Sequence, residues 1–409
     1  MKFVALSLGL FLSVMLSHAQ QVSLRGNLTM TSRTAVDAAG SLAYTVGPNN
    51  FAIVDLANPD VPVLRGQVTP NAPQLTGVDV LGNYAYCAGQ NQGLVVIRVQ
   101  NPATPQWLVN QPLASAARDV AAFDTLVAVA TATNVTLIGV RNPSDPNILA
   151  TYPRASSWIE YEPATGRLHV GTTTGAYALN VNATIGGGDT TYTLQLYDQF
   201  DTQSLTPLAI GGGYVNAVRD ASVRVINSST YNLVGQYTST ANIQAIASAP
   251  GYSFIGLATG IVQYLSQQGA NPTFLDGATV AGQVYGLALA SSGNQPLVVA
   301  AHATGLAVLD YDPLAADPEL PPVVPQEIAL SAYPNPFNGT VTLTLSAPQH
   351  GPYYLTVIDN LGREILRERL YVSGVMTHQL DLSNCAAGHY LARLSGKTGA
   401  ASLRLIYLP

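Results

Sequence analysis

The stretch FAIVDLANPDVPVLRG, Phe51–Gly66, joins two short apolar segments through a polar turn that contains two prolines. The first segment, which ends at Asp55, is rich in β-branched residues and is typical of a strand. Proline lacks a backbone N–H, so Pro59 and Pro62 suit a turn and the start of an edge strand. The stretch therefore predicts two neighbouring strands, of which the second lies at the edge of a sheet.

The same pattern recurs along the chain. Copies that still contain the Asn-Pro turn begin at Leu94 (LVVIRVQNPATPQWL) and Val135 (VTLIGVRNPSDPNIL), and related apolar strands begin near residues 176, 222, 261 and 306. Two strand-like segments precede each of these strands. Four short strands in about 40 residues are typical of a β-propeller blade. We count seven such units and predict an all-β fold with a seven-bladed β-propeller, with a β-helix or two sandwiches as alternatives.

The seventh unit, which ends in LAVLDYDP, lacks its fourth strand, and the start of the chain supplies a candidate for it. VSLRGNL at residues 22–28 resembles PVLRGQV at residues 62–68. We expect this N-terminal strand to complete the last blade, because an unpaired blade edge would invite aggregation. The pattern fades in units four to six, where NVNATIGGGDTTYTLQL predicts a long Gly- and Thr-rich loop followed by a strand.

Composition favours a secreted protein. The 409 residues are 47% hydrophobic and only 10% charged, and the 17 basic residues are spread thinly, so no nucleic-acid partner is expected. Residues 1–19 have the positive start, apolar run and small residues of a secretory signal peptide cut after Ala19. A membrane anchor is the alternative, but the run is short for a span and no transmembrane segment follows. Cys87 and Cys385 fall in different predicted domains, so no disulfide is expected.

The chain divides into four parts. After the signal peptide, residues 20–312 form the propeller, residues 313–327 a stiff Pro-rich linker, and residues 328–409 a separate domain. This last part contains seven strand-like segments with alternating apolar residues, separated by turns such as Gly351-Pro352. It is predicted to be a small Ig-like β-sandwich.

Two family resemblances follow from these motifs. FAIVDLANPDVPVLRG resembles the repeats of LVIVD propellers, a family that supplies no catalytic residues to transfer. Residues 328–409 resemble the type A sorting domain of the type IX secretion system, through YPNPFNG (Tyr333–Gly339), VIDNLGREI (Val357–Ile365) and LDLSNCAAGHYLARL (Leu380–Leu394). A lysine usual near the end of that domain is Arg404 here. The resemblance implies that the secretion machinery recognises this domain and exports the chain to the surface or exterior of a Gram-negative bacterium.

Motifs of catalysis are absent from the sequence: there is no HExxH, no G-x-S-x-G and no paired histidine ligands. A site in a propeller should lie at the channel mouth, where the first strand of each blade begins. The candidate ligand-binding residues there are Arg33, Arg118, Asp119, Trp158, Glu160 and Tyr285. Arg118 with Trp158 suggests an anion- or sugar-binding patch.

Asp37 and Asp79 hold equivalent places in two units, and Glu160 is a candidate third member. Such acids could bind a cation such as calcium, but acceptance of backbone N–H bonds is the favoured interpretation. No other cofactor is expected.

Two functions remain. The favoured one is a non-catalytic module that binds an extracellular protein or glycan. The alternative is a carbohydrate-active hydrolase or lyase at the channel mouth, for which Asp119 and Glu160 are the carboxylate pair to test.

Overall fold

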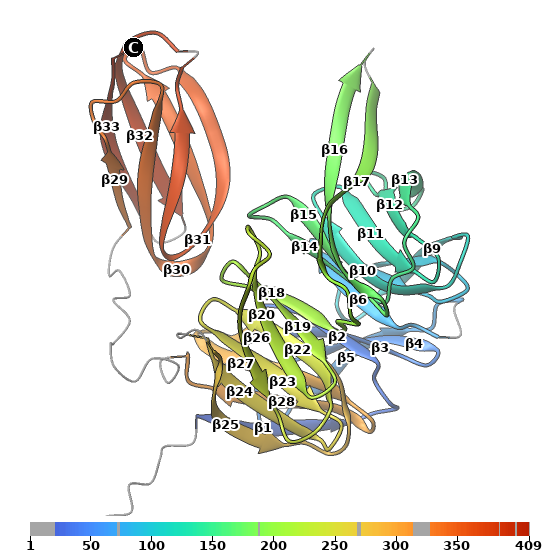
Figure 1. The fold of residues 1–409 in the computed structure, drawn as a ribbon. Helices are drawn as coiled ribbons and strands as arrows, with labels where there is room; N and C mark the ends of the chain where they lie inside the picture. Colours follow the sequence, from blue (N-terminus) through green and yellow to red (C-terminus); the bar gives the residue numbers. More distant parts are fainter. Residues whose placement is uncertain are drawn as a thin grey trace, which may run out of the picture. The chain divides into compact units, whose positions relative to one another are not determined.

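The structure is a computed structural model, and it describes residues 21–71, 74–186, 189–267, 271–313, 328–383, 385–396 and 399–408. The predicted signal peptide and residues 314–327 of the predicted linker lie outside these ranges. The chain forms two compact units, Met1–Pro318 and Glu319–Pro409. Nearly all of the regular structure in both is β-strand (Figure 1).

The described part of the first unit contains seven four-stranded antiparallel sheets, which we number in chain order. Sheets 1 and 2 consist of β2 (Ala35–Ala39), β3 (Leu42–Gly47), β4 (Asn50–Asp55) and β5 (Val63–Val68), and of β6 (Gly77–Leu81), β7 (Tyr84–Ala88), β8 (Leu94–Arg98) and β9 (Gln106–Gln111). Sheets 3 and 4 consist of β10 (Ala117–Phe123), β11 (Leu126–Thr131), β12 (Val135–Gly139) and β13 (Asn147–Tyr152), and of β14 (Trp158–Glu162), β15 (Arg167–Thr172), β16 (Gly175–Gly186) and β17 (Asp189–Asp201).

Sheets 5 and 6 consist of β18 (Leu208–Gly211), β19 (Tyr214–Arg219), β20 (Ser222–Asn227) and β21 (Leu233–Thr238), and of β22 (Ile243–Ala249), β23 (Tyr252–Leu257), β24 (Ile261–Ser266) and β25 (Thr273–Thr279). Sheet 7 consists of β26 (Val284–Ser292), β27 (Gln295–His302), β28 (Gly305–Tyr311) and, from the start of the chain, β1 (Val22–Thr29).

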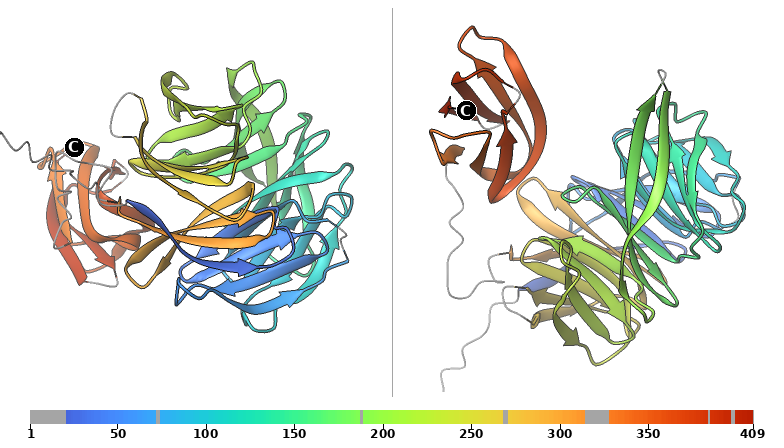
Figure 2. Two further views of the ribbon diagram at one scale, coloured as in Figure 1. Left: turned by 90° about the horizontal axis from the view of Figure 1, so that it is seen from below. Right: turned by 45° about the horizontal axis from the view of Figure 1, so that its top comes forward.

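The first strands of successive sheets lie against one another around a common centre (Figure 2). β2 contacts β6, β6 contacts β10, and the series continues through β14, β18 and β22 to β26, which contacts β2 again. Apolar side chains fill the space between neighbouring sheets, for example Phe51 and Ile53 of sheet 1 against Cys87 and Val95 of sheet 2. This is the architecture of a β-propeller.

The N-terminal strand closes this arrangement, as the sequence predicts. β1 pairs antiparallel with β28 from Val22 opposite Tyr311 to Thr29 opposite Gly305, and Figure 1 shows the two strands side by side. The backbone N–H groups of Gln21 and Val22 also donate to Asp276 Oδ2 of sheet 6, at 2.7 and 3.0 Å.

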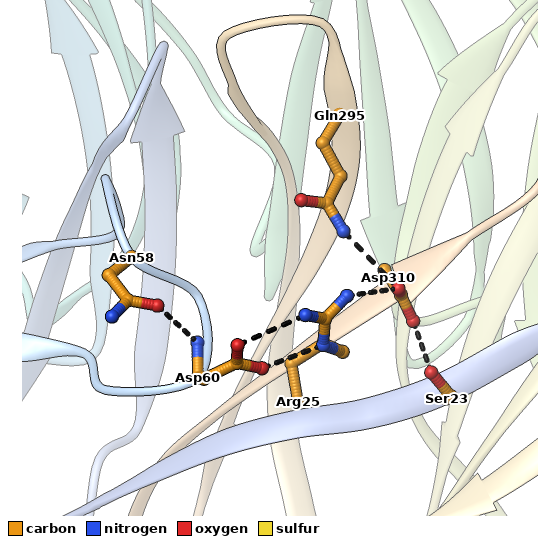
Figure 3. Close-up of polar contacts among 6 residues, drawn as sticks. All are labelled: Ser23, Arg25, Asn58, Asp60, Gln295 and Asp310. Atoms are coloured by element: carbon orange, nitrogen blue, oxygen red, sulfur yellow. Dashed lines mark hydrogen bonds and ion pairs between the residues drawn. The ribbon is translucent and has the colours of Figure 1, made fainter.

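Charged side chains hold β1 to both of its neighbours (Figure 3). The Arg25 guanidinium donates to both carboxylate oxygens of Asp60 in sheet 1, at 2.8 and 3.1 Å, and to Asp310 Oδ2 in β28 at 2.7 Å. Asp310 also accepts hydrogen bonds from the Ser23 hydroxyl and from Gln295 Nε2. We call the joint between sheets 7 and 1, with this network, the seam.

The Asn-Pro turns explain the most regular part of the sequence repeat. Oδ1 of Asn58, Asn101 and Asn142 each accepts a hydrogen bond from the backbone N–H two residues later, at 3.2, 3.1 and 3.3 Å. This Asx turn stabilises the bend, and the proline that follows fixes the backbone at its second position.

Two glycines explain the likeness of VSLRGNL and PVLRGQV. A Cβ on Gly26 of β1 would lie 2.5 Å from the carbonyl oxygen of Pro59 in sheet 1, and one on Gly66 of β5 would lie 2.4 Å from that of Pro102 in sheet 2. In both joints, therefore, only glycine lets the fourth strand approach the Asn-Pro turn of the next sheet.

A β-bulge interrupts the fourth strand of every one of these seven sheets, at equivalent places. The extra residues at these places are Arg25, Arg65, Leu108, Leu149, Tyr197, Val234 and Leu275, and β17 has a second extra residue, Phe200. A bulge bends and twists an edge strand, which discourages pairing between the edges of two molecules.

The Gly- and Thr-rich segment of sheet 4 differs from its predicted loop. β16 and β17 form one long hairpin, paired continuously out to Gly186 opposite Asp189, and it extends beyond the other strands in Figure 1. The strand predicted after the loop is confirmed as β17. The loop predicted before it was wrong, because pairing with β17 keeps residues 180–186 in β16, and Val181, Tyr192 and Leu194 pack against the core of sheets 3 and 4.

The second unit contains β29 (Ala329–Tyr333), β30 (Thr340–Asp359), β31 (Glu364–Asp381), β32 (Gly388–Gly396) and β33 (Gly399–Tyr407). They form one five-stranded network rather than seven separate strands. The turn predicted at Gly351-Pro352 is instead part of β30, where both residues pair with β31 after an irregularity beyond Ala347. Leu343, Leu355, Leu394 and Leu405 contribute to its core.

Both cysteines are free among the described residues: Cys87 is buried in β7, and Cys385 is partly exposed in the second unit. Within the same ranges, no helix has the length and apolar character that crossing a bilayer requires.

Candidate functional site

Four of the predicted acidic residues lie on four successive first strands. Asp37 (β2), Asp79 (β6), Asp119 (β10) and Glu160 (β14) line one cavity of about 180 Å³ at the centre of the propeller. Asp37, Asp79 and Glu160 are equivalent in register, because each pairs with the third residue of the following strand. Asp119 differs in register, because it pairs with Ala130, the fifth residue of β11, and so lies two residues before the equivalent position, Ala121.

Three of these carboxyls hold neighbouring sheets together. Asp37 Oδ2 accepts the backbone N–H of Val80 at 2.8 Å, and Asp79 Oδ2 accepts that of Ala122 at 2.6 Å. Asp119 Oδ2 accepts the N–H of Ile159 at 3.0 Å. Each bond runs from one sheet to the next, so these side chains fasten sheets 1 to 4 at the inner wall. This geometry supports the structural interpretation of the acids.

The four acidic side chains are buried close to one another, and their pKa values are raised. Burial raises the pKa of Asp119 to about 7, and burial together with the charges of Asp119, Asp79 and Asp37 raises the pKa of Glu160 well above its usual value. Burial also raises the pKa of Asp37 and of Asp79, and the nearby charge of Asp79 raises that of Asp37 further. The cavity therefore holds fewer than four negative charges at neutral pH.

Apolar residues form the opposite wall of this cavity, namely Ala245, Ile246, Gly286, Leu287, Ala288 and Leu289 of sheets 6 and 7. A hard cation such as calcium needs six to eight oxygen ligands around it. In the part of the chain that the structure describes, no group of three or more His, Cys, Asp or Glu side chains is placed to hold a metal ion.

Arg33 occupies a different environment from the one expected for a ligand-binding residue. Its side chain is completely buried, and it donates to Thr45 Oγ1 at 3.2 Å, to the Thr45 carbonyl at 2.6 Å and to the Asn50 side chain. Burial lowers its pKa to about 10. Arg33 therefore stabilises the turn between β3 and β4 from within, and its donors face protein oxygens rather than solvent.

Arg118 and Tyr285 are each the extra residue of a β-bulge at the start of a first strand. The exposed Arg118 donates to Ser157 Oγ at 3.1 Å, and Ser157 is the residue that precedes Trp158 in the chain. Tyr285 is half-buried and does not line the cavity that contains the four carboxyls. A bulge changes the direction in which a side chain points. The directions of the Arg118 and Tyr285 side chains therefore do not follow from the alternation of side chains along a regular strand.

Trp158 lines both the acidic cavity and a second, larger one of about 650 Å³. The larger cavity lies where sheets 4, 5 and 6 begin, beside β18, which is the shortest first strand with four residues. Because β18 begins only at Leu208, Val218 and Arg219 of β19 extend past it and line the cavity.

Sequence reasoning missed the polar residues of this larger cavity. Gln203, Ser204 and Thr206 come from the loop before β18, and Asn242 and Gln244 come from the start of β22. Gln244 is also the extra residue of a bulge, between Ile243 and Ala245. The only available signal was position, since these segments precede first strands in repeat units whose motif has faded.

Comparisons with known proteins agree with the two-part organisation. Residues 331–407 match the secretion system C-terminal sorting domain, and residues 34–69 and 75–110 match the LVIVD repeat. The chain is thus an LVIVD-repeat propeller protein with a sorting domain of the type IX secretion system. That domain indicates export by this system, and hence a secreted or cell-surface protein.

Solved structures support the fold alone. The WD40 β-propeller domain of Doa1 has a TM-score of 0.55 at 8% identity and covers 74% of this chain and 100% of its own. U3-55K has a TM-score of 0.55 at 10% identity, with coverages of 71% and 98%. Sqt1 of Saccharomyces cerevisiae has a TM-score of 0.53 at 11% identity, with coverages of 72% and 100%. No curated protein matches the sequence.

Proposed function

We propose that this protein is a non-catalytic binding module, exported by the type IX secretion system to the outer surface of a Gram-negative bacterium or into its surroundings. In this proposal the seven four-stranded sheets are the blades of one closed propeller, and the C-terminal unit is an Ig-like β-sandwich that the secretion machinery reads. The ligand is an extracellular protein or glycan, bound on the face where the first strands begin.

The sizes of the two cavities carry the proposal against catalysis. Ligand sites usually occupy about 300–1,000 Å³. The cavity with four carboxyls has only about 180 Å³, too little for two linked sugar rings around a scissile bond. The cavity of about 650 Å³ has room, but Asp220 is its one lining carboxylate. Glycoside hydrolysis requires two carboxyl groups around the substrate, and neither cavity combines that pair with the space.

One observation favours the alternative of a carbohydrate-active enzyme. A raised pKa such as that of Asp119 or Glu160 is what a general acid needs near neutral pH. Both functions can be tested with the mature chain and a panel of soluble polysaccharides, by measuring retention of the polymers and release of new reducing ends. Retention of a polymer or capture of a surface protein without new ends supports the binding module. Release of ends that stops in Asp119→Asn or Glu160→Gln would support the enzyme instead.

Export is tested separately. Removal of residues 328–409 in a host with a type IX system should leave the propeller in the periplasm, whereas the full chain reaches the surface or medium. The control is a propeller variant that folds normally, such as Asp145→Asn in an exposed turn. Unchanged export of the truncated chain would contradict the role of the C-terminal unit.

A further inference from the structure

The larger cavity has a lining that limits the chemistry of its ligand. Its one lining guanidinium, Arg219, is held by Asp201, with Nη2 at 3.1 Å from both carboxylate oxygens, and Arg224 approaches the same carboxylate at 3.4 Å. Its one lining carboxylate is Asp220. The charges of Arg219, Arg224, Asp201 and Asp220 sum to zero, and the one lining guanidinium is already engaged by Asp201, so the cavity favours a neutral ligand over a phosphate or an acidic one.

Unpaired amides face this cavity from two sheets. The side chains of Gln203, Asn242 and Gln244 line it and have no hydrogen-bond partner among the described residues. Each primary amide can donate two hydrogen bonds and accept two. Together with the hydroxyls of Ser204 and Thr206, they suit a ligand that carries many groups which both donate and accept, as sugar hydroxyls do.

The indole of Trp158 adds an apolar face to these polar groups. The chain contains two tryptophans, and their environments differ. Trp107 lies on the outer strand β9, and its Nε1 donates to Asn110 at 2.9 Å. Trp158 lines both central cavities, and its buried Nε1 has no partner within the described ranges. A flat aromatic face beside amides matches a sugar ring, whose C–H faces are apolar and whose rim is polar.

We propose that the cavity between sheets 4, 5 and 6 binds a neutral saccharide, with one ring stacked on Trp158 and its hydroxyls bonded to the amides of Asn242 and Gln244. This inference rests on the proposed binding function and adds to it both the ligand class and the place. The saccharide lies to one side of the propeller axis, over sheet 5, and not in the acidic cavity.

The two tryptophans make the test specific. In the full mature chain, Trp107→Phe leaves Trp158 as the only indole, so its fluorescence reports on the cavity. We would titrate this variant with neutral hexasaccharides of glucose, mannose, xylose and N-acetylglucosamine, and with an acidic galacturonate hexamer. At least one neutral hexasaccharide should give a saturable change with a dissociation constant of about 1 mM or tighter, and the acidic hexamer should give none.

Variants locate the binding. Gln244→Ala should weaken the affinity for the responding hexasaccharide at least about tenfold, the loss of roughly one good hydrogen bond. Trp158→Ala, followed by calorimetry, should remove the binding. The matched controls are Trp107→Ala for the indole and Gln111→Ala, on the outer strand β9, for the amide, and both should bind normally. Circular dichroism checks the fold of each, and Gln244→Ala decides the matter if Trp158→Ala does not fold.

Three results would overturn the inference: silence with every neutral hexasaccharide, a response to the acidic hexamer alone, or unchanged binding in Gln244→Ala. The proposed function is judged by a separate measurement, the capture of extracellular polymers or surface proteins by the wild-type chain. Capture that persists in Trp158→Ala and Gln244→Ala would leave a binding module whose site lies elsewhere. No capture and no saccharide response would remove both.

Discussion

The joints between sheets 1 to 4 are fastened at the first, innermost strands, whereas the seam is fastened at the fourth, outermost strand. At sheets 1 to 4 the bond lies on the inner wall, where Asp37, Asp79 and Asp119 accept backbone N–H groups of the next sheet. At the seam the inner wall has no such acid, and Gly286 packs closely against Ala35. The fastening there is the ion pair of Arg25 with Asp60 at the outer rim.

The difference follows from how the fourth strand of each sheet is connected. In sheets 1 to 4 the third and fourth strands are consecutive in the chain, whereas in sheet 7 the fourth strand, β1, comes from the start of the chain. At the seam, β1 is held in sheet 7 only by pairing with β28 and by side chains. A terminal strand can separate from its sheet while the rest of the fold stays intact, so it needs contacts of its own to stay in place. Its separation is a local opening reaction that stability measurements can resolve.

Removal of β1 should break the seam with the largest effect. Deletion of residues 20–29 leaves β28 as an open edge and removes the buried Val22 together with Ser23 and Arg25, two of the partners of Asp310. We expect the propeller to lose more than about 4 kcal/mol of its free energy of unfolding or to aggregate through the open edge. Size-exclusion chromatography and tryptophan fluorescence measure this, since both tryptophans lie in the propeller.

A synthetic peptide of residues 20–31 should restore part of the lost stability, whereas a scrambled peptide should not. A truncated chain that stays monomeric with an unchanged denaturation midpoint would show that the strand does not close the ring.

Two glycines offer a matched comparison of the seam with the joint of sheets 1 and 2, where the fourth strand β5 directly follows the third strand in the chain. Gly26→Ala and Gly66→Ala each place a Cβ about as close to a proline carbonyl of the next sheet, 2.5 and 2.4 Å. Both should cost about 1–3 kcal/mol of unfolding free energy through strain. Only Gly26→Ala should also expose the N-terminal strand to limited proteolysis, because β1 can detach and β5 cannot. Equal protease resistance in the two variants would contradict a weaker seam.

The sequence predicts the scaffold better than the site. The Asn-Pro turns and the LRG sequences near Arg25 and Arg65 could be recognised because a fixed backbone bend and a close approach demand particular residues. That demand makes the N-terminal strand identifiable as a missing fourth strand. The continuous β30 and β31 were not predicted, because glycine and proline indicate a turn locally while long-range pairing here keeps them in a strand.

The candidate site depended on details that a linear pattern does not contain. The positions of Asp37, Asp79 and Glu160 follow from the repeat alone, so their shared cavity could be anticipated. The burial of Arg33 could not, because it depends on acceptors supplied by the next turn. Gln244 could not be singled out either, since a bulge sets its direction and the short β18 opens the cavity beside it.

The joints between sheets 1 to 4 at the inner wall should contribute to the unfolding free energy in a way that depends on pH. Asp79→Ala removes the acceptor for the Ala122 N–H and should cost about 1–2 kcal/mol of unfolding free energy. Asp79→Asn keeps an acceptor and removes a negative charge from the crowded cavity, so it should cost less and become neutral or stabilising as the pH rises. Denaturant titrations from pH 4 to pH 9 measure both.

The sign of this dependence follows from linkage. Four carboxyls have folded-state pKa values above the unfolded value near 4, namely Asp37, Asp79, Asp119 and Glu160. Above pH 4 the folded chain therefore binds more protons than the unfolded chain, and for Asp119 this range extends to about pH 7. These groups therefore contribute stability that is present below pH 4 and is lost as the pH rises through the folded values. Asp79→Asn should flatten that decline, and Asp145→Asn should not. A wild-type propeller whose stability increases over this window would contradict it.

Arg25 and Arg65 give the smallest and most specific comparison. Both are the extra residue of a fourth-strand bulge, and each pairs with the acid at the end of the third strand: Arg25 with Asp310 at 2.7 Å and Arg65 with Asp55 at 3.4 Å. Only Arg25 also reaches the next sheet, because Asp60 occupies the place that Ala103 has beyond Arg65. Arg25→Ala should therefore lower the denaturation midpoint more than Arg65→Ala, which leaves a single long ion pair unmade.

Salt separates the two contributions of Arg25. Ion pairs at an exposed rim are screened as ionic strength rises, so the difference between the two variants should shrink from low salt to 1 M. Asp60→Ala should reproduce most of the Arg25→Ala effect, and the double variant should add little to either, because both remove the same contact. Additive losses would place the contribution of Arg25 within sheet 7. The seam would then be held by β-pairing and by the fit of Gly26 alone.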